Sequence, residues 1–115
     1  MERKMQISRP IIKTILETLN EKKAQNIKVF DVKHLTSLCE YIIISSTTNS
    51  THVRSLADDV AKTLKNNGIE YFNIERDIGY TWVVLDCDYF VVNIFHNKAR
   101  EFYNLEGIWA DANEL

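Results

Sequence analysis

Hydrophobic residues recur along the chain with two different periods, that of a helix and that of a strand. In the first stretch, apolar side chains between residues 7 and 19 fall on one helical face and polar side chains lie outside it. This spacing predicts a helix from about Arg9 to about Gln25. Ser8 is the expected cap, and Pro10 fits the first turn because an N–H group there has no helical partner.

A second helix is predicted between Asn49 and Gly68. Either Asn49 or Ser50 can cap its first turn, and Gly68 can adopt the left-handed conformation that ends a helix. The expected buried face repeats at positions three and four residues apart. It consists of Val53, Leu56, Ala57, Val60, Ala61 and Leu64.

Five segments have the composition of β-strands. Tyr41–Ser45 is an unbroken apolar run, typical of a central strand that is covered on both faces. The last two strands meet at Cys87-Asp88, which predicts an antiparallel hairpin. The second helix is long enough to make a parallel crossover from the second strand to the third. The other four strands are Ile27–Val32, Ile69–Glu75, Thr81–Asp86 and Tyr89–Phe95.

The elements follow one another in the order α-β-β-α-β-β-β-α. The last of them is a helix from Lys98 to about Leu105, ending at Gly107. This alternation predicts an α/β (α+β) fold with a five-stranded mixed β-sheet packed against helices. The 115 residues fit one domain that spans positions 1–115, without repeats or linkers.

The charge balance argues against one class of partner. Lys and Arg number 14 and Asp and Glu number 16, which gives a net charge of −2. The chain therefore lacks the clustered basic charge with which proteins bind nucleic-acid phosphates. We expect no direct sequence-specific binding to nucleic acid, and we expect a charged partner to be basic.

Cysteine usage and the N-terminus bear on the compartment. Cys39 and Cys87 lie far apart and form neither a disulfide framework nor a zinc-ligand pattern. The first ten residues lack the apolar stretch of a signal peptide, and no apolar run approaches the ~20 residues of a membrane helix. We expect a soluble cytoplasmic protein with reduced thiols and no membrane partner.

Asp86 and Asp88 are the candidates for metal chemistry. Two carboxylates one residue apart on a strand point to the same face and can hold a divalent cation, as in nucleotidyltransferases. Such sites also need a glycine-serine loop, and the nearest serines, Ser45 and Ser46, have no adjacent glycine. Acids that flank a hairpin turn are the simpler interpretation. A magnesium-dependent nucleotidyltransferase-like enzyme that uses Asp86 and Asp88 is the alternative function.

The three histidines do not have metal-ligand spacing. His52, near the start of the second helix, is interpreted as a solvated surface residue. His96 is interpreted as a packing or capping residue between the last strand and the last helix. We predict no catalytic residue, no metal and no cofactor.

Trp82 is the candidate for partner binding. In a regular strand Trp82 and Asp86 share one face, and Val83 and Leu85 share the other. If Val83 and Leu85 face the core, an exposed tryptophan stands beside an acid, which is typical of a protein-binding hot spot. The opposite orientation, with Trp82 in the core, is equally open at this point.

Several motifs have a pattern in common with a known family. They include Asp31-Val32, the run from Tyr41 to Ser46 and the strand Trp82-Val83-Val84-Leu85-Asp86. The most specific is the C-terminal pattern RxFYxLExxW, which covers Arg100 to Trp109. On these residues the chain resembles, over nearly its whole length, the ribosomal silencing factor (RsfS, or Iojap-like) family.

The resemblance implies a fold similar to that of nucleotidyltransferases, without their catalytic set. It also implies a protein that binds the large ribosomal subunit through its protein fourteen, on the face where the small subunit joins. By the same resemblance, occupying that face is expected to block subunit association and to lower translation when nutrients are scarce. A homodimer is compatible with this role, because a short chain with exposed aromatic side chains often self-associates.

The partner-binding residues of the family correspond to Trp82, Asp86, Glu75, Cys87 and Tyr103. Because a regular strand places Trp82 and Cys87 on opposite faces, a bulge or an approach along the strand edge is needed for both to contact one partner. An acidic edge with an aromatic anchor complements the basic surface of a ribosomal protein.

Three sites depart from the family pattern. Cys87-Asp88-Tyr89 stands where the family has a Leu/Tyr-Gly-Asp turn, Asn93 stands for His, and Arg76 stands for Gly. A turn without glycine is expected to have a different geometry. Asn93 removes a titratable group, so an acid–base role at that position is not expected.

Overall fold

The computed structural model describes residues 10–115 and contains one six-stranded sheet. Its strand order is β3-β4-β5-β2-β1-β6. Strands β2 and β5 are parallel and the other neighbouring pairs are antiparallel, so the predicted mixed sheet is confirmed. The strands are β1 (Gln25–Asp31), β2 (Tyr41–Thr47), β3 (Asn73–Arg76), β4 (Trp82–Asp86), β5 (Phe90–His96) and β6 (Asn113–Glu114).

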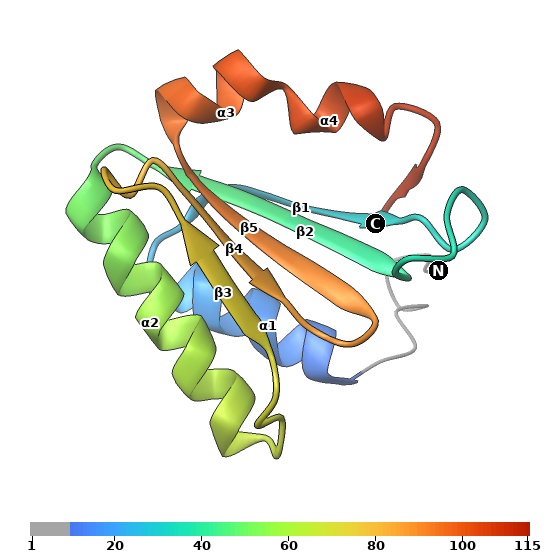
Figure 1. The fold of residues 1–115 in the computed structure, drawn as a ribbon, viewed down its shortest axis with the longest axis horizontal. Helices are drawn as coiled ribbons and strands as arrows, with labels where there is room; N and C mark the ends of the chain where they lie inside the picture. Colours follow the sequence, from blue (N-terminus) through green and yellow to red (C-terminus); the bar gives the residue numbers. More distant parts are fainter. Residues whose placement is uncertain (1–9) are drawn as a thin grey trace.

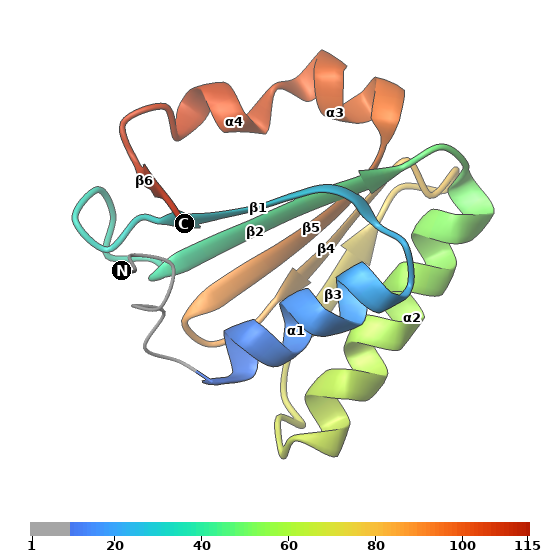
Figure 2. The same ribbon diagram turned by 180° about the vertical axis from the view of Figure 1, so that it is seen from behind.

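The helices lie on opposite sides of this sheet, two on each side (Figures 1 and 2). Helices α1 (Pro10–Glu21) and α2 (Ser50–Asn66) cover one face. Helices α3 (Asn97–Tyr103) and α4 (Leu105–Ile108) lie over the other. Each face has its own hydrophobic cluster. No helix between residues 10 and 115 has both the length and the apolar character of a membrane-spanning segment.

The larger cluster lies between the sheet and the pair α1 and α2. Most described positions of the apolar stripes predicted for the two helices are buried in it, including Ile12, Leu19 and Leu56, while Ile11, Leu16 and Ala61 are partly buried. Ile7, at the start of the first predicted stripe, lies outside the described residues. All seven residues of β2 are buried, which confirms the central strand predicted from its continuous apolar run. Strands β4 and β5 form the predicted antiparallel hairpin. The smaller cluster, under α3 and α4, consists mainly of Phe30, Val32, Ile42, Ile44 and Phe95.

The ends of α2 are those that its sequence predicts. The side chain of Asn49 accepts a hydrogen bond from the backbone N–H of His52 at 2.8 Å, so Asn49 rather than Ser50 is the cap. At the other end Gly68 has a φ of 86°, and the N–H of Ile69 returns to the carbonyl of Leu64. This is the left-handed stop that favours glycine.

Helix α1 is shorter than predicted: it ends at Glu21, not at Gln25. Lys23 adopts a φ of 70°, and the N–H of Ala24 bonds to the carbonyl of Leu19. The same left-handed stop therefore operates without glycine, which is why the sequence pattern did not reveal it. The expected cap Ser8 and the expected start at Arg9 lie outside the described residues.

The other corrections concern short elements. Strand β3 begins at Asn73 rather than at Ile69, because residues 69–72 follow an irregular path while Ile69 and Phe72 still pack on the core. The last helix is divided at Asn104, whose φ is 48°. The sixth strand, β6, was not predicted because it has only two residues, both exposed.

The crossover through α2 leads to a parallel strand, as predicted, but that strand, β3, is not adjacent to β2. Register relations make β3 parallel to β2, as a crossover requires. The chain passes over β5 and β4 and places β3 at the edge of the sheet. The hairpin then fills the gap between them. Both the edge strand β3 and the hairpin strand β4 therefore belong to the half of the sheet that carries the candidate site.

Candidate binding surface

Strand β4 settles which way Trp82 faces. Val83 and Leu85 are buried in the cluster beneath α1 and α2. Trp82, Val84 and Asp86 therefore point to the opposite face, toward α3. Trp82 is half-buried and Asp86 is exposed. Of the two orientations that the sequence left open, the structure has the one that places Trp82 beside the acid.

Neighbouring rings hold Trp82 in a defined orientation. Its indole stacks on Phe95 with 4.8 Å between ring centroids, and Tyr103 lies at the same distance, tilted by 43°. The indole Nε1–H donates to the Oδ1 of Asn93 at 3.0 Å. Offset and tilted contacts of this kind are favourable aromatic pairs. These contacts hold the half-buried tryptophan in one orientation.

Two hollows flank Trp82 and differ in chemistry. The hollow toward β3 has a volume of about 340 Å³ and is lined by polar side chains together with the rings of Trp82 and Tyr103. The hollow toward α4 has about 420 Å³ and is mostly apolar, with Leu38, Leu105 and Trp109 in its wall. Trp82 lines both hollows, so each of them gives access to part of the indole.

Acidic side chains complete this face. Glu75 on β3 is paired in register with Val84, and it therefore shares a face with Trp82. Both Glu75 and Asp86 are exposed. Each lines one of the two hollows, Glu75 that toward β3 and Asp86 that toward α4. We call the set formed by Glu75, Trp82, Val84, Asp86 and Tyr103 the Trp82 surface.

The loop before β4 is fixed by Asp77. Its carboxylate accepts hydrogen bonds from the backbone N–H groups of Thr81 and Trp82 and from the Thr81 hydroxyl. Desolvation raises the pKa of Asp77, but these hydrogen bonds outweigh it and leave the pKa below its usual value. Arg76, which stands where the family has glycine, lies over the ring of Tyr80 at 4.5 Å. The loop is therefore ordered although it lacks that glycine.

Cys87 does not lie on the Trp82 surface. It continues the alternation of β4, so its side chain is buried on the α1 and α2 side of the sheet. Burial, assisted by the charge of Asp86, raises the pKa of the Cys87 thiol to about 12. The bulge that would bring Cys87 and Trp82 to one face is absent from the paired residues of β4 and β5, whose register is continuous. The structure therefore brings together four of the five predicted binding residues.

The two aspartates of the hairpin, Asp86 and Asp88, line different hollows of the protein. Asp86 lines the apolar hollow beside Trp82, whereas Asp88 lines another hollow with Lys33 and Glu40. Within residues 10–115, no group of three or more His, Cys, Asp or Glu side chains is placed to hold a metal ion. The nucleotidyltransferase alternative thus finds no third ligand in the described part of the chain.

Two histidines have structural partners. His96 caps α3 by accepting from the N–H of Lys98, which confirms the capping interpretation. His52 is not simply solvated, because both of its ring nitrogens are engaged, Nδ1 with the Thr47 hydroxyl and Nε2 with the carbonyl of Lys22. Since a carbonyl oxygen only accepts, Nε2 carries a proton. His52 therefore ties the start of α2 to β2 and to the end of α1.

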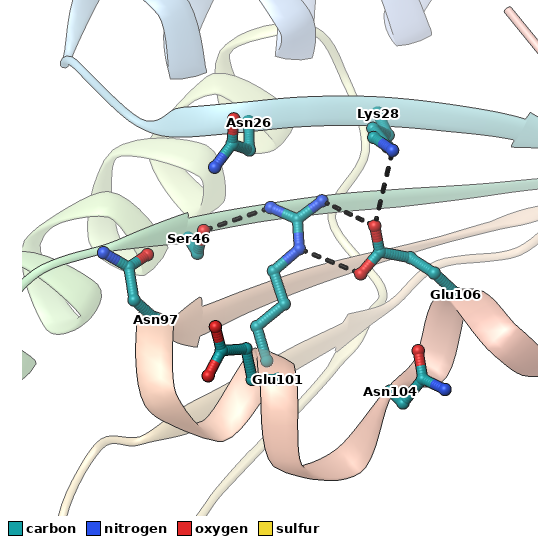
Figure 3. Close-up of a pocket in the computed structure, with 8 residues that line it drawn as sticks. Asn26, Lys28, Ser46, Asn97, Glu101, Asn104 and Glu106 are labelled. Carbon is teal, nitrogen blue, oxygen red and sulfur yellow. Dashed lines mark hydrogen bonds and ion pairs between the residues drawn. The ribbon is translucent and has the colours of Figure 1, made fainter.

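A polar cavity of about 600 Å³ lies on the same side of the sheet, between α3 and β1 (Figure 3). Arg100 is buried there and makes a two-pronged ion pair with Glu106, Nε to Oε1 at 3.1 Å and Nη2 to Oε2 at 3.2 Å. Its Nη1 donates to the Ser46 hydroxyl at 3.1 Å, and Lys28 lies 3.6 Å from Glu106. In the sequence, Arg100 and Glu106 are notable only as members of the family motif RxFYxLExxW, in which they stand six residues apart.

The ion pair predicts a pH dependence of stability. Hydrogen bonds from Arg100 hold the pKa of Glu106 below its ordinary value of 4.5. A carboxyl with a lowered pKa in the folded state stabilises the protein above 4.5, and that stabilisation is lost as the pH falls through the folded-state pKa. At pH 7 Glu106→Gln is therefore expected to be less stable than the wild type, and the difference should shrink below pH 4.5.

Urea unfolding of both proteins between pH 7 and pH 3 measures this effect. Glu101→Gln is the matched control, since Glu101 is exposed and lines the same cavity. A difference between wild type and Glu106→Gln that is the same at pH 7 and pH 3 would contradict the assignment.

The family model "Ribosomal silencing factor during starvation" (RsfS) matches residues 5–115. The RsfS protein of Haemophilus influenzae is 34% identical over 100 residues, which cover 87% of this chain and 98% of that protein. A crystal structure of a protein from Chromobacterium violaceum superposes with a TM-score of 0.84 at 29% identity, covering 88% of this chain and 84% of the other. A mouse protein named "Mitochondrial assembly of ribosomal large subunit protein 1" is 26% identical, covering 85% of this chain and 44% of its own length. The chain belongs to the ribosomal silencing factor (RsfS) family.

Proposed function

We propose that this protein binds the large ribosomal subunit through its protein fourteen and sterically blocks joining of the small subunit, which represses translation under nutrient limitation. The role requires a binding surface and steric bulk, and no bond is made or broken. Membership of the ribosomal silencing factor family supports a regulator that associates with the ribosome. The name of the mouse relative also refers to the large subunit.

The observation that carries the proposal is the pre-ordered tryptophan of the Trp82 surface. Binding hot spots are enriched in tryptophan and tyrosine, and a partner gains most from a side chain whose freedom is already lost. Trp82 meets this condition through its contacts with Phe95, Tyr103 and Asn93. The hollows on both sides of the indole provide room for partner side chains.

Charge supports the choice of partner. Glu75 and Asp86 add two negative charges to the exposed face around Trp82, and neither takes part in a salt bridge with another residue of the described chain. A ribosomal protein surface is basic, so the two surfaces attract each other over the distance of encounter.

Co-sedimentation tests the proposal directly. Purified protein is expected to sediment with isolated large subunits and to reduce the yield of joined ribosomes when small subunits are added afterwards. Immobilised protein fourteen of the large subunit should capture it without other ribosomal components. Sedimentation of the free protein in the same runs reports whether it forms a homodimer. Failure to sediment with large subunits would refute the proposal, and binding without an effect on joining would refute its steric part.

Neutralising the two acids is expected to slow association. In the double variant Glu75→Gln with Asp86→Asn, the association rate with large subunits should fall severalfold at low salt, while dissociation changes little. The difference should fade as the salt concentration rises, because salt screens exposed charges. Stopped-flow or surface-based kinetics at several salt concentrations measure both rates.

The matched control removes the same charge elsewhere. Asp58→Asn with Asp59→Asn changes two carboxylates on α2, on the other side of the sheet. If this control slows association as much as the first pair, net charge rather than the Trp82 surface steers the encounter.

A further inference from the structure

Helices α3 and α4 are too short to hold their own positions. They have seven and four residues, whereas isolated helices below about 12 residues are marginal in water. Asn104, between them, adopts a left-handed conformation that interrupts the helical path. Their orientation on the sheet must therefore come from contacts with other parts of the chain. One of them, α3, carries Tyr103 of the Trp82 surface.

The most buried of these contacts is the ion pair of Arg100 and Glu106. Arg100 is the buried residue of α3, while α4 has none. A two-pronged guanidinium–carboxylate pair fixes orientation as well as distance. The further bond to Ser46 attaches the pair to β2, and Lys28 approaches it from β1 (Figure 3). A single guanidinium thus joins α3 to α4 and to the centre of the sheet.

Tyr103 lies next to this attachment on α3. It follows Arg100 by three residues, so the two are neighbours along one side of α3. The tyrosine ring lies 4.8 Å from Trp82 but remains 50% exposed, and the adjacent Phe102 is 81% exposed. Because half of the Tyr103 side chain is exposed, its place against Trp82 depends on the rotation of the helix that carries it.

We propose that Arg100 and Glu106 are positioning residues of the Trp82 surface: their ion pair holds α3 in the rotation that places the ring of Tyr103 against Trp82. Arg100 is 8% exposed, so it acts on a partner through Tyr103 and not by contact. Apolar packing is non-directional and by itself does not fix the rotation of a helix. The two parallel hydrogen bonds of a guanidinium–carboxylate pair do fix an orientation. The binding consequence of this inference rests on the proposed function, but the structural consequence does not.

Arg100→Lys tests the inference, because lysine keeps the charge and loses the planar fork. Nuclear Overhauser effects between the ring protons of Trp82 and Tyr103 are expected in the wild type and should weaken strongly in Arg100→Lys. Affinity for large subunits should fall about tenfold. Glu106→Gln, which keeps the shape and loses the charge, should change both readouts in the same direction, and Glu101→Gln should change neither. Thermal unfolding of each variant identifies the temperature range in which all are folded.

A double-mutant cycle separates positioning from a general effect on stability. Tyr103→Ala is made alone and together with Arg100→Lys. If Arg100 acts through Tyr103, then Arg100→Lys should change affinity by less than about twofold once the tyrosine is gone. A tenfold loss in both backgrounds overturns the proposal, as does an unchanged Overhauser effect in Arg100→Lys. If wild-type protein does not bind large subunits, the proposed function fails, and the Overhauser measurement alone decides the positioning.

Discussion

Trp82→Ala is expected to lower affinity for the large ribosomal subunit by about a hundredfold, the largest effect of any single substitution on the Trp82 surface. The indole lines two hollows, so its removal changes both of them and withdraws a side chain that a partner seated in either hollow would contact. It also removes the surface against which Tyr103 rests. The loss should appear mainly as faster dissociation, since the charges that steer encounter are unchanged. Co-sedimentation over a range of subunit concentrations measures the affinity.

Two controls make this result specific. Trp82→Phe keeps an aromatic ring against Phe95 and loses the hydrogen bond to Asn93, so it should bind with intermediate affinity. Circular dichroism and thermal unfolding show whether Trp82→Ala remains folded at the temperature of the binding assay. A folded Trp82→Ala protein that sediments with large subunits as well as the wild type would show that Trp82 is not the anchor.

Leu85→Ala is expected to have the largest effect on stability, with a loss of about 2–5 kcal/mol in the free energy of unfolding. Leu85 is completely buried in the cluster beneath α1 and α2. Truncation there leaves a cavity in a close-packed interior in addition to the lost burial of three carbon atoms. Affinity of the folded fraction for large subunits should be close to that of the wild type, because the side chain faces away from the Trp82 surface.

Its neighbour in the chain is the natural comparison. Val84 is half-buried on the opposite face of β4, so Val84→Ala should cost less than about 1 kcal/mol in stability. The two substitutions are expected to separate folding from binding. Leu85→Ala should lower the urea midpoint of unfolding, whereas Val84→Ala should mainly lower affinity for large subunits. Equal losses of stability in the two variants would contradict the assignment of the faces.

The hydrophobic pattern was sufficient for most of the fold. Helical and strand periods determined the order of the main elements, and the unbroken run at β2 identified the central strand. Asn49 and Gly68 marked the two ends of α2, because capping and left-handed conformation depend on single residue types. Where an end had no such residue, as at Lys23 in α1, the boundary was predicted four residues too late.

The candidate surface was only partly visible before the structure. The alternation of β4 divided its side chains into two sets, and family motifs indicated Trp82, Glu75, Asp86, Cys87 and Tyr103. Neither the alternation nor the motifs determined which set faces the larger core, because both faces of this strand carry apolar residues. The packing of α1 and α2 on one side of the sheet decided it: Val83, Leu85 and Cys87 are buried there, and Trp82 lies half-buried on the opposite face, against the smaller cluster.

Local residue preferences thus determined this protein's main helices and strands, including the central strand β2, since spacing and capping act within a few neighbouring positions. Tertiary packing alone decided the orientation of Trp82, the exclusion of Cys87 from its surface, and the ion pair that joins Arg100 to Glu106 and Ser46. These are contacts between elements distant along the chain or separated by a break in the helix. Their geometry exists only when the sheet and both layers of helices have come together.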